Sequence, residues 1–289
     1  MAAFDASSFR EALVADDADA VWDALEADPS LATADVGGET PRGLCPSEGK
    51  AAAALDEFAA CARLRAEHPS ASLRDCRRFS RARNGDHAKA TAFLGADTKW
   101  RESFKPSAVA QSDLPVALST GAWRVLGMSD VGSPVLLVST RLWNPHLYGI
   151  DEYAKYVAYF CEGLARMGDK FVVLFDMSGW RMKHALELKK VAKLVDTVQN
   201  HYPERLEAAL MLRAPRIFAA SWSVIKTFVD AQTAEKIRWP KAPQEAEAFA
   251  AASVPLAILP TDYGGARREA DCPVPGIPGE PDVVVVSHN

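Results

Sequence analysis

The chain has 289 residues, of which 48% are hydrophobic and 25% are charged, and its formal net charge is -5. This composition is typical of a folded globular protein, and the acidic balance argues against a general nucleic-acid binder. The N-terminus has neither the charged nor the apolar region of a signal peptide, and no apolar run is long enough to span a bilayer, so any membrane contact is expected to be peripheral.

Residues 1–48 are rich in Ala and Asp and are predicted to form a helical N-terminal extension. A short helix is expected over Asp19–Ala27, and Asp28-Pro29 stops it. The GETP sequence at Gly38–Pro41 resembles part of an ankyrin repeat. Because one such repeat cannot bury its own apolar face, the extension is either a degenerate ankyrin-like unit or an ordinary Ala-rich helical segment.

A small helical lobe is expected over residues 49–110. Ser72 followed by Asp75 resembles a capping box, and Asn84-Gly85 is a stop signal. Apolar spacing and these end signals predict helices at Ala51–Glu67, Leu73–Arg83 and Asp86–Trp100.

From Trp123 onward, the pattern changes to strands that alternate with helices. Helices are expected at Asp151–Met167, with Asp151 as the cap, and at His184–Gln199. The alternation predicts βαβ units and therefore an α/β fold with a mostly parallel sheet flanked by helices. The Pro-rich tail, residues 266–289, is expected to be irregular, with Val283–Val286 as a candidate edge strand. Strands are predicted at Pro134–Thr140, Phe171–Met177, Ala208–Leu212 and Lys236–Trp239.

The segment Tyr202–Lys236 carries the most information about function. It re-enters a helix at Pro215 that is apolar on most of its faces, so this helix must be buried on two sides or must cover something apolar. Small polar and charged groups stand at both ends of the segment. That pattern suits a ligand with a long apolar body and an anionic head.

Six motifs, in order along some 190 residues, resemble those of the CRAL-TRIO domain. This lipid-binding family includes the yeast phosphatidylinositol/phosphatidylcholine transfer protein and the tocopherol and retinaldehyde carriers. YPER at Tyr202–Arg205 and LPxxYGG at Leu259–Gly265 match the family's motifs residue for residue. The other four resemble the motifs "LxRFLRARKF", "WR", "DxxG" and "NAPxxF", and they lie at Leu73–Arg83, Trp100–Phe104, Phe171–Trp180 and Ala214–Phe218.

The resemblance implies a lipid-binding domain over residues 118–265, in which a mobile gate helix around Ile217–Val229 covers an apolar slot. Each buried CH₂ is worth about 0.8 kcal/mol, so a lipid carrier must offer a slot as apolar as a bilayer. Ordinary core packing is the alternative interpretation of the same side chains. The predicted slot and gate residues are Tyr153, Tyr156, Phe160, Phe171, Val173, Phe175, Ile217, Phe218, Trp222, Ile225 and Phe228.

The resemblance also implies a headgroup site. The positions that phosphatidylinositol-binding members use read Arg83, Glu204, Thr233 and Lys236. Lys and Arg neutralise a phosphodiester, Thr donates a hydrogen bond, and Glu accepts from inositol hydroxyls. The alternatives are an internal salt bridge between Glu204 and Lys236, and a solvated basic helix around Arg83. Phe171 and Val173 stand where phosphatidylcholine-binding members carry Ser and Thr, so a choline site of that kind is not expected.

The favoured hypothesis is a cytoplasmic, peripherally membrane-bound protein that transfers or presents a phospholipid, above all phosphatidylinositol, without acting as an enzyme. The first alternative is a carrier of a tocopherol, retinoid, carotenoid or sterol. The second is a membrane-sensing adaptor that binds proteins through residues 1–48 or the tail. The chain has no P-loop, dinucleotide fingerprint or G-x-S-x-G motif, and its five cysteines form no C-x-x-C pair, so no metal, nucleic acid or cofactor besides the bound lipid is expected.

Overall fold

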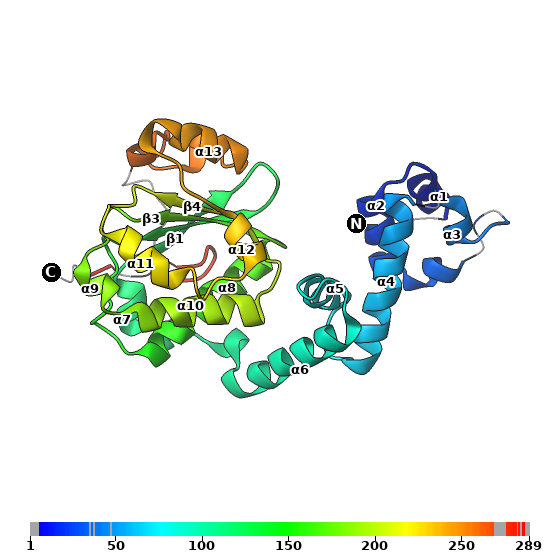
Figure 1. Ribbon diagram of the computed structural model, residues 1–289, viewed down its shortest axis with the longest axis horizontal. Helices are drawn as coiled ribbons and strands as arrows, with labels where there is room; N and C mark the ends of the chain where they lie inside the picture. Colours follow the sequence, from blue (N-terminus) through cyan, green and yellow to red (C-terminus); the bar gives the residue numbers. More distant parts are fainter. Residues whose placement is uncertain are drawn as a thin grey trace. The chain divides into compact units, whose positions relative to one another are not determined.

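The computed structural model describes residues 6–34, 36, 38–46, 48–268, 276–281, 283, 285 and 286. The chain divides into two compact units, Met1–Lys99 and Trp100–Asn289, coloured blue to cyan and green to red in Figure 1. Each unit has a hydrophobic core of its own. In the described part of the chain, no helix is both long enough and apolar enough to cross a membrane.

The first unit is helical, and a single core holds it together. Phe9 and Trp22 from the N-terminal extension share this core with Phe58, Phe79 and Phe93 from the helices that follow. The extension and the helical lobe therefore bury their apolar faces against each other. The elements are α1 (Ala6–Val14), α2 (Ala18–Ala27), η1 (Pro29–Thr33), α3 (Pro41–Leu44), α4 (Lys50–Glu67), α5 (Leu73–Arg81) and α6 (His87–Phe104), the last of which continues into the second unit.

The helices predicted in this unit are confirmed as α2, α4, α5 and α6, while α1 and α3 are additional. The expected capping box is present: the Asp75 N–H donates to Ser72 Oγ at 3.1 Å, and the Ser72 N–H donates to Asp75 Oδ2 at 3.2 Å. α5 ends because Asn84 and Gly85 take the left-handed φ values of 52° and 76°. The ankyrin-like interpretation of the extension stays a prediction.

The second unit is built on a five-stranded sheet in the order β1-β2-β3-β4-β5. β2 to β5 are parallel neighbours, and β1 pairs antiparallel with β2, so the predicted mostly parallel sheet is confirmed. The strands are β1 (Trp123–Met128), β2 (Pro134–Ser139), β3 (Phe171–Asp176), β4 (Leu206–Leu212) and β5 (Ile237–Arg238).

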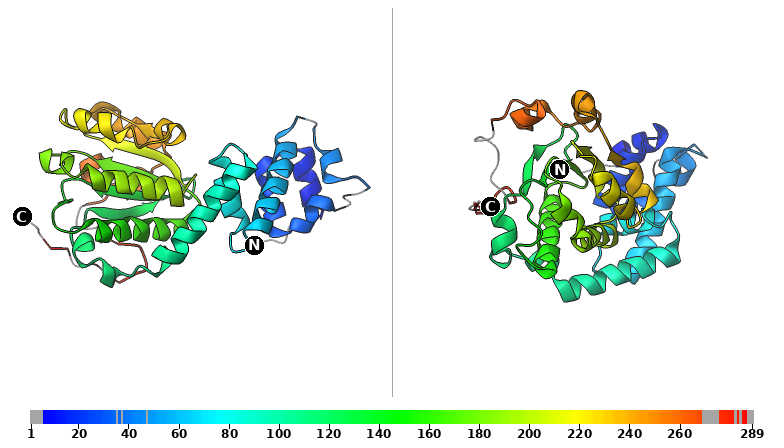
Figure 2. Two further views of the ribbon diagram at one scale, coloured as in Figure 1. Left: turned by 60° about the horizontal axis from the view of Figure 1, so that its bottom comes forward. Right: turned by 60° about the vertical axis from the view of Figure 1, so that its left-hand side comes forward.

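The crossover helices lie on one face of this sheet, and a later helix covers the other face (Figure 1). α8 (Ile150–Met167), α10 (Leu188–His201) and α11 (Phe218–Ile225) cover the first face, and α13 (Glu245–Ala251) lies on the opposite face. Figure 2 shows the same layers from two further directions, with α13 in orange. The shorter elements are η2 (Pro106–Ala108), η3 (Gln111–Asp113), α7 (Pro115–Ser119), α9 (Met182–Ala185), α12 (Ala231–Glu235), η4 (Ala242–Gln244), η5 (Leu256–Ile258) and η6 (Thr261–Tyr263).

Three local predictions were wrong. The N-cap of α8 is Gly149, and Asp151 lies in the first turn, where its charge suits the helix dipole. The helix expected at His184–Gln199 is divided into α9 and α10, because His184 turns back to cap the single turn of α9: the Arg181 N–H donates to His184 Nδ1 at 2.8 Å. The gate helix is shorter than expected, since α11 ends at Ile225 and a turn follows it.

The described part of the tail is irregular, as predicted. Val283, Val285 and Val286 belong to no strand, and Val284 lies outside the described residues. Ile277 is buried against α8, where a Cβ on Gly163 would come within 2.4 Å of its Cδ1. Glu280 accepts a 2.6 Å hydrogen bond from the Tyr159 hydroxyl. The tail therefore packs against α8 at Tyr159 and Gly163.

Candidate functional site

The pleat of the sheet turns alternate side chains toward the crossover helices. On β3, Phe171, Val173 and Phe175 face α8, α10 and α11, whereas Val172 and Leu174 pack on the opposite face. The same alternation places Ala209 of β4 on the helix side and Ala208 on the other. The strands are therefore buried on both faces, and the face covered by α8, α10 and α11 encloses an apolar space.

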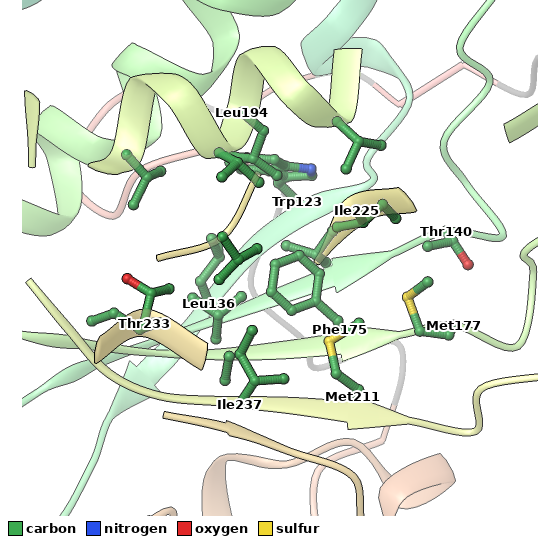
Figure 3. Close-up of a pocket in the computed structure, with 18 of the residues that line it drawn as sticks. Trp123, Leu136, Thr140, Phe175, Met177, Leu194, Met211, Ile225, Thr233 and Ile237 are labelled. Atoms are coloured by element: carbon green, nitrogen blue, oxygen red, sulfur yellow. The ribbon is translucent and has the colours of Figure 1, made fainter. Parts of the chain in front are cut away.

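That space, called the main cavity below, has a volume of about 170 Å³. In Figure 3, Leu136, Phe175 and Met211 rise from the strands toward Leu194 and Ile225 on the helices. No Asp, Glu, Lys or Arg lies on its wall among the residues that the structure describes, and the residues there that carry an amide or a hydroxyl group are Thr140, Tyr153, Gln199 and Thr233. The cavity therefore suits an uncharged apolar chain.

Most of the predicted slot residues are on this wall. Tyr156 and Phe160 are not: they pack against Trp123, with ring centroids 5.0 and 5.2 Å apart. Ile217 and Phe228 are 42% and 40% exposed, so they point away from the cavity. The predicted residues that line the wall are Tyr153, Phe171, Val173, Phe175, Phe218, Trp222 and Ile225.

Sequence reasoning missed two groups of wall residues. The first lies on α10, whose apolar stripe indicated an inward face but not a ligand wall; it consists of Val191, Leu194, Val195 and Val198. The second is aromatic and lies in loops: Trp143 follows β2, and Trp180 follows β3. Loop positions carry no periodicity, so hydrophobic spacing does not mark them, and Trp180 was noted only as the end of the motif at Phe171–Trp180.

A buried histidine organises the aromatic end of the main cavity. His184 stacks near Trp143 and Trp180, with ring centroids 5.4 and 5.3 Å away. Its Nδ1 accepts from the Arg181 N–H, so Nε2 carries the proton and donates to the Trp143 carbonyl at 2.8 Å. Burial lowers the pKa of His184, and the neighbouring cations Lys183 and Arg181 lower it further. This histidine is therefore neutral near pH 7.

α11 closes the main cavity and is tied to it by few polar contacts. The Trp180 indole N–H donates to Ser221 Oγ at 3.2 Å. After the helix, one side chain holds the chain in place: the Gln199 amide donates to the Phe228 carbonyl at 2.9 Å, and its oxygen accepts from the Asp230 N–H at 2.7 Å. Gln199 itself lines the cavity. α11 and the segment that follows it to Asp230, called the cover below, are therefore held by apolar packing and by a small number of hydrogen bonds.

The predicted headgroup residues of the second unit lie together at one end of the main cavity. Thr233 is on the wall, and its hydroxyl donates to Asp230 Oδ2 at 2.8 Å. The Lys236 N–H donates to the Thr233 carbonyl at 3.1 Å, and Lys236 Nζ lies 3.4 Å from Glu204 Oε2. The side chains of Lys236 and Glu204 are 27% and 23% exposed. The ion pair that was the alternative interpretation of these two residues is therefore present.

Arg83 belongs to the first unit. Its guanidinium lies 3.6 Å from the centroid of the Phe93 ring and donates to the Ala82 carbonyl at 2.8 Å. Among its neighbours, Arg77 lies 3.0 Å from the Glu57 carboxylate, and Arg81, whose side chain is 48% exposed, also pairs with it. These arginines tie α5 to α4.

Comparisons with known proteins agree with the fold. A family model described as CRAL/TRIO domain matches residues 118–265. The solved structure of Sfh5 superposes with a TM-score of 0.53 at 17% identity, covering 61% of this chain and 67% of that one. Since that identity is low, this likeness shows the fold alone.

Three curated relatives illustrate the range of similar proteins. "Protein real-time" of Anopheles gambiae is 27% identical over 242 residues, which is 73% of this chain and 34% of that protein. "Phosphatidylinositol transfer protein CSR1" of Eremothecium gossypii is 28% identical over 218 residues, 70% of this chain and 48% of the relative. "Alpha-tocopherol transfer protein-like" of Mus musculus is 29% identical over 223 residues, which is 72% of this chain and 64% of that protein. This chain thus spans between about a third and two thirds of these relatives.

Proposed function

Because the chain belongs to the CRAL/TRIO family, we propose that it holds one phospholipid in the main cavity and transfers it between membranes or presents it there, without changing it chemically. The preferred lipid in this proposal is phosphatidylinositol. The acyl chains lie between the sheet and the crossover helices, and the headgroup lies at Thr233, Lys236 and Glu204.

The uncharged wall of the main cavity is the observation that carries the proposal. A lipid that leaves a bilayer loses about 0.8 kcal/mol for each CH₂ exposed to water, and an equally apolar wall restores it. At about 170 Å³ the cavity is smaller than the pockets of about 300–1,000 Å³ that hold drug-sized ligands. A whole phospholipid therefore enters when α11 moves outward. Ile217, Val224 and Phe228, which are exposed around this helix, supply an apolar surface for docking on a bilayer.

The ion pair at the end of the cavity supports an inositol headgroup. Between partly exposed groups, such a pair is worth about 0–1 kcal/mol, so a phosphodiester displaces Glu204 from Lys236 at little cost. The released carboxylate then accepts hydrogen bonds from ring hydroxyls, and the Thr233 hydroxyl turns from Asp230 Oδ2 to donate to the phosphate. The relative named as a phosphatidylinositol transfer protein adds support at 28% identity.

The headgroup assignment is tested by Lys236→Ala, with the exposed Lys241→Ala as the matched control. Transfer of labelled phosphatidylinositol between vesicles is expected to fall about tenfold in the first variant, because a charge-assisted contact contributes roughly 1.5 kcal/mol. Lys241→Ala is expected to behave like the wild type. Equal transfer by all three proteins contradicts the assignment.

A second candidate, a carrier of a neutral hydrophobe, is favoured by one specific observation. The Trp143 indole N–H is buried on the cavity wall beside the buried Tyr148 hydroxyl, and neither group makes a hydrogen bond of good geometry within the described chain. A ligand with an apolar body and one hydroxyl or carbonyl oxygen, such as a tocopherol, retinoid, carotenoid or sterol, satisfies this donor. Trp143→Phe is then expected to weaken binding of the hydroxylated ligand and to leave phosphatidylinositol binding unchanged. If the variant binds the hydroxylated ligand as tightly as the wild type does, this candidate is rejected.

A further inference from the structure

A second, polar pocket lies on the face of the sheet opposite the main cavity. Because side chains alternate along a strand, Arg124 of β1, Ser139 of β2 and Asp176 of β3 point away from the crossover helices. They line a pocket of about 270 Å³ that shares no wall residue with the main cavity. We call it the arginine pocket. It lies at the carboxyl ends of parallel strands, where open α/β sheets bind their ligands.

Positive charge prevails on the wall of the arginine pocket. Three arginines line it from separate segments: Arg124 from β1, Arg141 from the loop after β2, and Arg213 from the loop after β4. The carboxylates on the same wall are Asp176 and Asp262. The described wall thus carries one positive charge more than it carries negative charges.

Asp176 forms no ion pair within the described residues, because neutral donors already hold both of its oxygens, although its negative charge still counts on this wall. It is 4% exposed; Oδ1 accepts from the Ser178 N–H at 2.9 Å, and Oδ2 accepts from the Tyr263 hydroxyl at 2.7 Å. Burial and the adjacent Asp176 carboxylate raise the pKa of Tyr263, so the phenol keeps its proton and continues to donate. Asp176 therefore holds Ser178 and Tyr263 in position on the wall of the pocket.

Within the described residues, Arg213 makes one side-chain hydrogen bond and one long ion pair. Its guanidinium lies 4.6 Å from the centroid of the Tyr263 ring, and it donates to the Asp262 carbonyl. The nearest carboxylate in an ion pair with it is that of Glu245, whose Oε2 lies a long 3.9 Å from Arg213 Nε. A guanidinium has five N–H donors, so Arg213 can still bind an oxyanion.

Arg141 is the freest of the three arginines. It is exposed, and no hydrogen bond or ion pair of its side chain occurs within the described residues. Arginine binds phosphate oxygens in a fork geometry, and hydroxyls such as that of Ser139 add neutral donors. An acyl chain cannot form hydrogen bonds with such groups, whereas a compact anion with several oxygens can accept hydrogen bonds from them.

We propose that the arginine pocket is a second binding site, for a phosphate group carried by a soluble phosphate ester or by an anionic lipid headgroup. Arg141 and Arg213 contact the phosphate oxygens directly, Arg124 adds charge at the strand side, and Tyr263 holds Arg213 in place. This site is independent of the lipid in the main cavity.

The test is a calorimetric titration of the full chain with inorganic phosphate and with inositol monophosphate, against chloride at equal ionic strength. The wild type is expected to bind one phosphate group saturably, and Arg141→Gln to bind it about tenfold more weakly. Because Arg141 is exposed and unpaired in the described chain, the variant should keep the fold. The matched control is Lys170→Gln, which removes an exposed positive charge at the opposite end of β3 and should bind like the wild type.

Two outcomes overturn the proposal: no saturable binding by the wild type, or equal binding by the wild type and Arg141→Gln. Vesicles of phosphatidylcholine with phosphatidic acid distinguish the sources of the phosphate. Loss of vesicle binding in Arg141→Gln identifies the headgroup as the source, and loss confined to the soluble esters identifies a free phosphate compound. Transfer of phosphatidylinositol should be unchanged in Arg141→Gln, so a failure of this proposal is separable from a failure of the lipid-carrier proposal.

Discussion

The two faces of the sheet are packed differently along β4: one face is filled by neighbouring side chains, and the other borders a cavity. On β4, Ala208 and Leu210 close against Phe249 of α13 in a continuous core. Their neighbours Ala209 and Met211 face the main cavity of about 170 Å³. Protein interiors are normally close-packed, so an unfilled apolar space of this size between the strands and the crossover helices supports the proposal that a ligand binds there.

The comparison shows that burial alone does not identify a ligand site. Both faces of β3 and β4 are apolar and protected from water, and they differ in whether the opposing layer fills the space above them. α13 meets its face closely, whereas α10 and α11 leave room above Phe175 and Met211 (Figure 3). Matched substitutions on the two faces therefore test the difference.

The largest expected effect comes from truncating neighbouring side chains of β4. Leu210→Ala should lower the free energy of unfolding by about 2–5 kcal/mol, because it opens a void in a filled core. Met211→Ala should cost less, since Met211 borders the main cavity and has already lost packing partners on that side. Urea unfolding of both variants measures the difference, and equal losses would mean that the two faces are packed alike.

The next prediction enlarges neighbouring side chains instead. Ala208→Phe overpacks the filled face and should destabilise the fold by roughly 1–3 kcal/mol. Ala209→Phe places its ring in the main cavity, so it should be tolerated but should reduce lipid capture at least tenfold. If Ala209→Phe still loads lipid like the wild type, the lipid does not occupy this cavity.

His184 makes the cavity face sensitive to acid. Its folded-state pKa is lowered, so the unfolded chain binds more protons once the pH falls below the ordinary histidine pKa of about 6.5. Its contribution to stability is complete above that pH and is lost as the pH falls through the folded-state pKa, at no more than about 1.4 kcal/mol per pH unit. Stability to urea measured from pH 7.5 to 5.0 should fall less steeply in His184→Gln than in the wild type, and equal pH dependence in the two proteins would contradict this role of His184.

The smallest effect on stability is expected at the cover of the main cavity. Gln199→Ala removes the two hydrogen bonds that hold Phe228 and Asp230, each worth about 0.5–1.5 kcal/mol at most. The variant should exchange bound lipid several-fold faster with little change in its unfolding midpoint. Asn200→Ala, one position further along α10 and facing Asp196, is the matched control. Unchanged exchange in Gln199→Ala would show that the cover does not open at this contact.

Much of the fold was predictable because its signals are periodic. The apolar runs that predicted strands at Pro134–Thr140 and Phe171–Met177 are confirmed as β2 and β3, and the spacing at His184–Gln199 led to α10. The antiparallel β1 was not identified as a strand. The division between α9 and α10 was also missed, because it depends on a single side-chain contact from His184 to the Arg181 backbone.

The site was predictable in part. The motif around Thr233 and Lys236 led to one end of the main cavity, and the pair formed by Glu204 and Lys236 was foreseen as an alternative. The wall residues of the main cavity were harder to predict, because the alternation of side chains along a strand does not show which of two buried faces borders a cavity. Tyr156 and Phe160 share the apolar stripe of α8 with Tyr153, yet they lie in the packed core against Trp123.

The first unit adds a further lesson about boundaries. Composition separated residues 1–48 from the helices that follow, but Phe9 and Trp22 share one core with Phe58. A protein shortened to begin at Lys50 would expose this core. The adaptor role suggested for the extension is therefore better tested by exchanging its exposed residues than by deleting it.

The central claim is that the main cavity holds a phospholipid whose headgroup meets Lys236. The most direct measurement is mass spectrometry of the lipids that the purified protein captures from mixed liposomes, compared with Lys236→Ala and Ala209→Phe. The account predicts enrichment of phosphatidylinositol in the wild type, selective loss of that lipid in Lys236→Ala, and loss of all lipids in Ala209→Phe. Capture of the same lipids by all three proteins, or of no lipid by the wild type, would contradict it.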